Sequence, residues 1–225
     1  MATLQELRRY YQRRYAAPPG AMRDYRSYLD LIDAEPGSRI LDVGCGEGFF
    51  LEEAIRGGLA AVGVEIVQPA LRLARQRIGG GKLAAAAGEA LPFADASMDF
   101  VACLGSLEHF AQPAAGAQEV ARVLRPDGQA MIAVPNRQFL GWLFLRRQGT
   151  EQQEVAELLL DRQGWIDLLT AAGLEVVAIS KEPWHTKPFP SVLKRIVVRA
   201  AWHLIPLRWT YQFVIRCRRP PCHSV

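Results

Sequence analysis

Three closely spaced glycines, Gly44, Gly46 and Gly48, are the residues of this sequence best suited to bind a ligand through the backbone. They follow an apolar run over 40–43, typical of a short buried strand, and precede a helical pattern of apolar residues over 49–54. Glycine permits unusual dihedrals and has no Cβ to keep a ligand at a distance. The first N–H groups of a helix lack internal partners and point outward. The pattern therefore predicts a nucleotide-type site at this turn.

An acidic residue, Glu65, ends the next predicted strand, 17 residues after Gly48. In nucleotide-binding folds a carboxylate at this place accepts hydrogen bonds from the ribose hydroxyls. The alternative is an ordinary solvated acid at the end of a strand. Because the glycine turn lies at the expected distance, we favour the ribose-binding role.

The turn differs from a dinucleotide fingerprint in its order of residues, G-C-G-E-G-F instead of G-x-G-x-x-G. Phe49 follows the last glycine, and the acid Glu47 occupies the place where a pyrophosphate would come. An acid suits the positive end of a helix dipole but repels a phosphate. A phosphate-free ligand that carries an ammonium and a sulfonium fits better, which disfavours an NAD-type oxidoreductase, the rival enzyme class.

Four blocks of sequence resemble class I S-adenosylmethionine (SAM)-dependent methyltransferases, in particular those of the ubiquinone/menaquinone type. ILDVGCGEGFF is similar to the family's first motif and GVEI to its second. AAGEALPFADASMDFVACLGSLEHF and EVARVLRPDGQAMIAVPN are similar to two later blocks. The blocks occur in the family order and at the family spacing over about 39–136, and together they are specific.

The resemblance implies a set of SAM-binding residues. Those at the methionine end, at the ribose, around the adenine and beneath the sulfonium are, in chain order, Asp42, Gly44, Cys45, Gly46, Glu65, Ile66, Glu89, Ala90, Leu91, Leu104 and Gly105. Glu65 would bind the ribose, and Glu89 would accept from the exocyclic amine of the adenine. Two residues depart from the family pattern: Glu89 stands where Asp is usual, and Asp127 replaces a glycine of a turn, where Asp tolerates a left-handed backbone.

A methyltransferase needs mainly to align its acceptor, since a sulfonium is already an activated methyl donor. An oxygen or carbon acceptor must also lose a proton, and His109 is the best-placed candidate base. The alternative is a structural histidine that caps the loop 105–112. We expect a small-molecule or lipid-like acceptor, with O-methylation favoured over C- or N-methylation, and no metal. Residues 137–149, the N-terminal tyrosines and either Trp165 or Trp184 are candidates to enclose it.

The elements that must position these residues alternate between strand and helix. The expected strands are 39–43, 60–65, 82–87, 98–104, 128–134, 174–179 and 211–217, and the expected helices are 3–15, 22–33, 47–57, 68–78, 113–124 and 162–172. Such alternation predicts an α/β protein with a mostly parallel sheet. The resemblance specifies a Rossmann-like class I methyltransferase fold, with seven strands, helices on both faces and the last strand antiparallel. We expect a single domain over 1–225, with a helical lid over 1–35, a SAM-binding core over 36–182 and a final part over 183–225.

Composition and charge indicate which location and partners to expect for this chain of 225 residues. Its four cysteines show no zinc or CxxC spacing, and no apolar run reaches about 18 residues, so we expect a cytoplasmic protein without a spanning helix. The net charge of +4 comes from residues 181–225, which hold nine Lys/Arg and one Glu, so no nucleic-acid partner is indicated. Residues 190–219 include a basic amphipathic stretch that either packs on the sheet or contacts a membrane surface. No obligate protein partner is indicated, and a SAM-binding protein without turnover stays open as an alternative.

Overall fold

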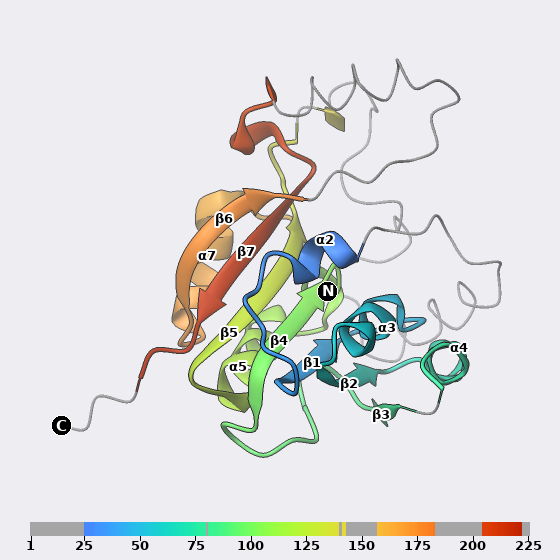
Figure 1. The fold of residues 1–225 in the computed structure, drawn as a ribbon. Coiled ribbons are helices and arrows are strands. Elements are labelled where there is room, and N and C mark those ends of the chain that lie inside the picture. Colours follow the sequence, from blue (N-terminus) through green and yellow to red (C-terminus); the bar gives the residue numbers. More distant parts are fainter. Residues whose placement is uncertain (1–24, 80, 140, 143–156, 183–203, 222–225) are drawn as a thin grey trace, which may run out of the picture.

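The computed structural model describes residues 25–79, 81–139, 141–142, 157–182 and 204–221. They form an α/β fold around one seven-stranded sheet, in the order β3-β2-β1-β4-β5-β7-β6 (Figure 1). The strands are β1 Arg39–Val43, β2 Ala60–Glu65, β3 Lys82–Ala85, β4 Met98–Leu104, β5 Leu124–Pro135, β6 Glu175–Lys181 and β7 Gln212–Arg218. The helices are α2 Arg26–Leu29, α3 Phe49–Arg56, α4 Gln68–Arg77, α5 Pro113–Val123 and α7 Arg162–Ala171, with short 3₁₀ turns η1 Leu107–His109 and η2 Leu207–Trp209.

The predicted topology is confirmed. Strands β3, β2, β1, β4 and β5 are joined by parallel pairing, and β7 pairs antiparallel with both β5 and β6. The carboxyl ends of β1, β2, β3, β4 and β5 therefore share one edge of the sheet. Ligands of such sheets bind beyond that edge.

Each face of the sheet is covered by its own apolar cluster. Leu41, Val43 and Val101 point to the face covered by α5 and α7, whereas Ile40 and Phe100 point to the face covered by α2 and α3. Successive side chains of a strand alternate between faces, so a strand covered on both sides must be apolar throughout. This explains the unbroken apolar runs in the sequence.

The structure moves several of the predicted boundaries. The third strand ends at Ala85, and the fifth begins at Leu124, four residues earlier than expected. The pairing of β4 with β5 shifts register between Met98 and Phe100, so β5 has a bulge opposite these two residues. Asp127 lies in this bulge with a φ of 62°, which confirms that it takes a left-handed conformation. Aspartate is among the few non-glycine residues that adopt it readily.

The two ends of the predicted domain are described only in part. The predicted helix 3–15 lies outside the described residues, and of the helix 22–33 the structure forms the short α2, where Tyr28 is fully buried. Residues 183–203, the larger part of the predicted basic stretch, also lie outside. Within 204–219, β7 is an interior strand of the sheet and is not available to a membrane. None of the helices in the described ranges has both the length and the apolar character needed to cross a bilayer.

Candidate functional site

The glycine turn leaves the carboxyl end of β1 in a left-handed backbone. Gly44, Gly46 and Gly48 have φ values of 74°, 52° and 80°. A Cβ added to Gly44 would lie 2.4 Å from Oγ of Ser106, in the loop after β4, and one added to Gly48 would lie 3.0 Å from Cβ of Ala74 on α4. Glycine is therefore required at these two positions by conformation and by close contacts within the protein itself.

Glu65 is bound to the glycine turn. Its Oε2 accepts a hydrogen bond from N–H of Gly46 at 3.0 Å, and its Oε1 accepts from N–H of Val67 at 2.9 Å. An ionised carboxylate has about four acceptor positions. Two backbone donors thus fix the orientation of this carboxylate and leave capacity for hydroxyl groups of a ligand.

Asp42 and Glu65 form a buried acidic pair, with residue exposures of 3% and 7%. Burial, and to a smaller extent the negative charge of Glu65, raise the pKa of Asp42 to about 8. Burial also raises the pKa of Glu65, although the N–H groups of Val67, Gly46 and Ile66 oppose this. Within the described ranges neither carboxylate forms an ion pair with a lysine or arginine. Since buried charges need compensation, this pair suits a cationic ligand, and the residues present fit the ammonium and sulfonium of SAM.

Glu47, the acid that was predicted to repel a phosphate, is paired with Arg77 of α4. Nε of Arg77 donates to the backbone oxygen of Glu47 at 3.0 Å, its Nη2 lies 3.8 Å from Oε2 of Glu47, and its guanidinium lies 3.5 Å from the ring centre of Phe49. Tyr25 stacks on Phe49, with the two ring centres 6.2 Å apart. Because Arg77 offsets the charge of Glu47, repulsion by Glu47 is a weaker argument against a phosphate than the sequence indicated. The buried acids Asp42 and Glu65 carry that argument instead.

The predicted adenine-binding residues lie in the loop between β3 and β4. Oε1 of Glu89 accepts a hydrogen bond from N–H of Gln112 at 3.3 Å, at the start of α5, where the helix dipole favours a negative charge. Ala90 is exposed, whereas the side chain of Leu91 packs into the core. Of these three residues, the structure therefore places Leu91 as an anchor of the loop and leaves Glu89 and Ala90 nearer the surface.

The remaining predicted cofactor residues line the same edge of the sheet. Gly105 has a φ of 72° and donates its N–H to the oxygen of Ala133 on β5. Leu104 is buried in the cluster beneath α3, and Ile66 is partly buried directly after β2. Cys45 is buried in the glycine turn, and burial raises the pKa of its thiol well above the usual value. Its side chain is therefore a neutral packing group.

His109 ends the 3₁₀ turn η1 and is buried between two carboxylates. Its Nε2 lies 3.6 Å from Oε1 of Glu157 and 3.8 Å from Oε1 of Glu108. The backbone oxygen of Glu108 accepts from N–H of Leu158, so the segment at 157–158 runs beside η1. Glu157 is 48 residues from His109 and belongs to no motif, so nothing in the sequence predicted this contact. The described residues contain no group of three or more His, Cys, Asp or Glu side chains arranged to hold a metal ion.

Asn136 organises the edge of the sheet next to η1. Its Nδ2 donates to the backbone oxygens of Arg208 and Thr210, at 2.9 and 2.8 Å, and its own backbone oxygen accepts from Nε1 of Trp142. Trp142 and Tyr211 are in edge contact, with ring centres 5.7 Å apart. This part of the predicted acceptor region is thus tied to the start of β7.

The two tryptophans that were candidates for the acceptor pocket have different outcomes. Trp165 is fully buried in the core, and its Nε1 donates to the oxygen of Pro135 at 2.9 Å. It stabilises the packing of α7 on the sheet, so its predicted place in the pocket wall is wrong. Trp184 lies outside the described residues.

Part of this chain is similar to a known protein family. A family model described as a methyltransferase domain matches residues 41–132, the part of the chain that contains the glycine turn, Glu65 and His109. The match covers less than half of the 225 residues.

Curated relatives match this chain over part of their own length. A ubiquinone biosynthesis O-methyltransferase of Aromatoleum aromaticum is 34% identical over 124 residues, which are 52% of this chain and 53% of that protein. The chain thus spans about half the length of the curated relatives it matches. Among solved structures, a putative methyltransferase of Haloferax volcanii in complex with the activator Trm112 has a TM-score of 0.67 at 20% identity, and covers 89% of this chain and 91% of its own.

A second solved structure shows what the fold alone does not decide. The cyclase SpnF has a TM-score of 0.66 at 17% identity, over 97% of this chain and 94% of its own. The same architecture therefore occurs in a protein named for a different reaction. The function of this chain has to be argued from its own residues.

Proposed function

We propose that this protein is a SAM-dependent methyltransferase that acts on the hydroxyl group of a small-molecule or lipid-like acceptor. The observation that carries the proposal is the buried pair Asp42 and Glu65, held at the glycine turn without a compensating cation among the described residues. The match of residues 41–132 to the methyltransferase-domain model supports it.

The cofactor-binding role falls to residues of the first two strands. When bound, SAM supplies a methyl group already activated by its sulfonium. Asp42 offers a negative charge to the cationic methionine end, and Glu65, oriented by Gly46 and Val67, offers its remaining lone pairs to the ribose hydroxyls. The segment Glu89–Leu91 contributes to the adenine side.

The acceptor-side role falls to His109. A hydroxyl acceptor must lose its proton as it is methylated, and an imidazole takes up protons near neutral pH. Glu108 and Glu157, both within 4 Å of Nε2, stabilise the imidazolium that results. The names of the ubiquinone biosynthesis O-methyltransferases among the relatives support oxygen as the accepting atom.

Calorimetry followed by turnover tests the proposal. SAM is expected to bind and NAD is not, and release of S-adenosylhomocysteine is expected with a member of a panel of phenols, quinone precursors and isoprenoid lipids. Binding of NAD without binding of SAM would overturn the assignment of the cofactor. Binding of SAM without turnover of any acceptor would support the alternative, a SAM-binding protein that transfers no methyl group.

A further inference from the structure

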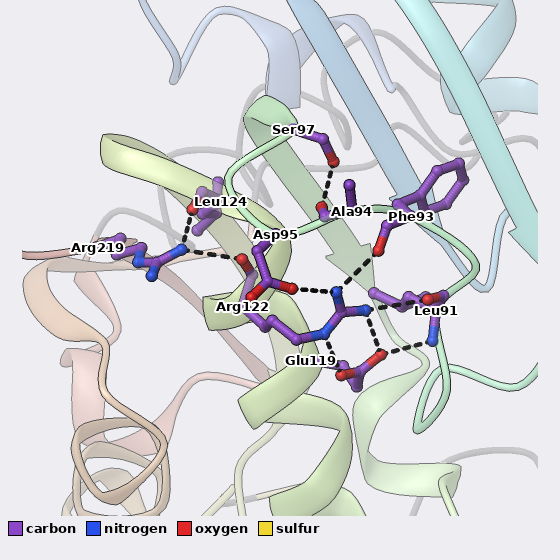
Figure 2. A network of polar contacts seen from close by, with 9 residues as sticks. All are labelled: Leu91, Phe93, Ala94, Asp95, Ser97, Glu119, Arg122, Leu124 and Arg219. Carbon is purple, nitrogen blue, oxygen red and sulfur yellow. Dashed lines mark hydrogen bonds and ion pairs between the residues drawn. The ribbon is translucent and has the colours of Figure 1, made fainter.

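The loop that follows Glu89 is bound along the whole length of α5. N–H of Leu91 donates to Oε2 of Glu119 at 2.7 Å, and farther along the loop N–H of Ala96 donates to the oxygen of Arg122 at 3.0 Å. Figure 2 shows the contact between Leu91 and Glu119 and the guanidinium of Arg122, which lies between α5 and the loop. Since Glu89 itself accepts from Gln112 at the start of α5, the helix holds the loop at both of its ends.

Every N–H donor of Arg122 has a partner in this arrangement. Nε and Nη2 form a bidentate pair with Glu119, at 2.6 and 2.8 Å, while Nη1 donates to the side chain of Asp95 at 2.7 Å. Nη1 also donates to the backbone oxygen of Phe93 at 2.8 Å, and Nη2 to that of Leu91 at 3.0 Å. These contacts account for the five donors of a guanidinium. An ammonium has three donors and no planar fork, so lysine cannot reproduce them.

Leu91 is held from both sides of its peptide unit. Glu119 accepts from its N–H, Arg122 donates to its oxygen, and its side chain is buried in the core. The hydrogen bond from Arg122 lowers the pKa of Glu119, which keeps this carboxylate ionised. The position of Glu89, two residues earlier, is therefore fixed from Leu91 on one side and from Gln112 on the other.

We propose that Arg122 and Glu119 are positioning residues that hold the segment Glu89–Leu91 in place and so set the selectivity of the site for a purine with an exocyclic amine. The inference rests on the proposed function, because it requires that this segment meets the base of SAM. It adds that base selectivity depends on an ion pair on α5 that does not itself touch the ligand.

The experiment compares two ligands that differ only at the amine. S-adenosylhomocysteine and its purine analogue, in which a hydrogen atom replaces the exocyclic amine, are titrated into the wild-type protein, into Arg122→Lys and into Glu119→Gln. The wild type is expected to prefer the adenine ligand by about tenfold, the value of one hydrogen bond. Both variants are expected to reduce this ratio to about twofold or less, because the carboxylate of Glu89 is no longer held in one place.

A matched control tests whether any broken ion pair has this effect. Arg218 forms the same bidentate pair with Glu175, at 2.8 and 3.0 Å, between β7 and β6 and away from the loop. Arg218→Lys is expected to keep the wild-type ratio. Thermal unfolding of all variants identifies those that are folded, and a ratio measured within one folded variant does not depend on its overall stability.

The outcomes separate the inference from the proposed function. If the wild type binds neither ligand, the proposed function fails. If the wild type binds both equally, or if Arg122→Lys and Glu119→Gln keep its preference, the function stands and the inference is overturned. Should Arg122→Lys not fold, Glu119→Gln, which retains an oxygen for N–H of Leu91, decides the question.

Discussion

The proposed cofactor side and the proposed acceptor side of the site are built from different kinds of contact. On the cofactor side, Glu65 binds the backbone of Gly46 and Val67, 19 and two residues away. On the acceptor side, Asn136 bonds to the backbone of Arg208 and Thr210, 72 and 74 residues away. His109 meets Glu157 over a comparably long separation.

This difference separates what the fold determines from what is particular to this chain. The cofactor side depends on two neighbouring strands, β1 and β2, and on the glycine turn after β1, so its contacts are made within a short stretch of sequence. The acceptor side depends on where distant segments return to the sheet. Substitutions on the acceptor side are therefore expected to leave binding of the cofactor unchanged.

The largest effect is expected from His109→Gln, which tests whether the acceptor side acts separately. Loss of a general base lowers kcat by about 10²- to 10⁴-fold. The dissociation constant of SAM should stay within about twofold, because no contact of the glycine turn is lost. Single-turnover rates and calorimetry measure the two quantities. Unchanged turnover across the pH range would leave His109 with a structural role only.

The next largest effect is expected from Glu65→Ala on the cofactor side. Loss of two hydrogen bonds to a charged group weakens SAM binding by roughly 100-fold. Glu175→Ala, which removes an exposed carboxylate from β6, is the matched control and should leave binding unchanged. Equal affinities for SAM in the two variants would show that the ribose is bound elsewhere.

A smaller effect is expected from Gly44→Ala, which probes the close contact between the glycine turn and Ser106. The left-handed φ costs roughly 1 to 2 kcal/mol, and the clash with Ser106 adds to it. Gly37→Ala is the control, since Gly37 has a φ of 87° but no atom within 4 Å of the added Cβ. Urea denaturation should show Gly44→Ala to be the less stable of the two. Equal losses would mean that Ser106 moves away freely.

The smallest effect concerns the pH dependence conferred by Asp42. In the unfolded chain this carboxyl ionises near 3.8, whereas in the folded protein its pKa is about 8. The folded state therefore binds more protons between these values, and the free energy of unfolding of the ligand-free protein falls as pH rises through this window. Binding of a cation requires the ionised form, so SAM affinity should rise by up to about tenfold per unit between about pH 6 and 7.

Asp42→Asn separates these two effects from other titrations. The variant is expected to lose both the fall in stability and the rise in affinity with pH. Chemical denaturation and calorimetry at a series of pH values measure them. A wild-type affinity that is flat over pH 6 to 7 would mean that Asp42 does not face the cationic part of the ligand.

The features predicted for the cofactor side are local. The glycine spacing and the acid at the end of β2 are visible within one or two elements, and the structure places them at the carboxyl edge of the sheet, whereas the left-handed Asp127 lies near the start of β5, at the opposite edge. The seven strands and the antiparallel β7 followed from the family resemblance and are confirmed. The roles of the individual site residues stay predictions.

The rest depended on contacts between distant residues. Nothing near Glu47 in the sequence indicates that Arg77, on another helix, offsets its charge. From the sequence, Trp165 was a candidate to enclose the acceptor. Its indole lies in the core instead, where α7 packs against β5. The carboxylate of Glu157 beside His109 likewise comes from a segment without any motif.

The placement of β7 between β5 and β6 has a consequence for how the protein is made. Until Gln212–Arg218 has left the ribosome, β5 and β6 each present an open edge with unpaired backbone groups. A nascent chain that stalls before this point carries two strands with unpaired edges, which can pair with other chains. Closure of the sheet therefore waits for the segment 212–218, and factors that shield strand edges would be needed most until this segment has emerged.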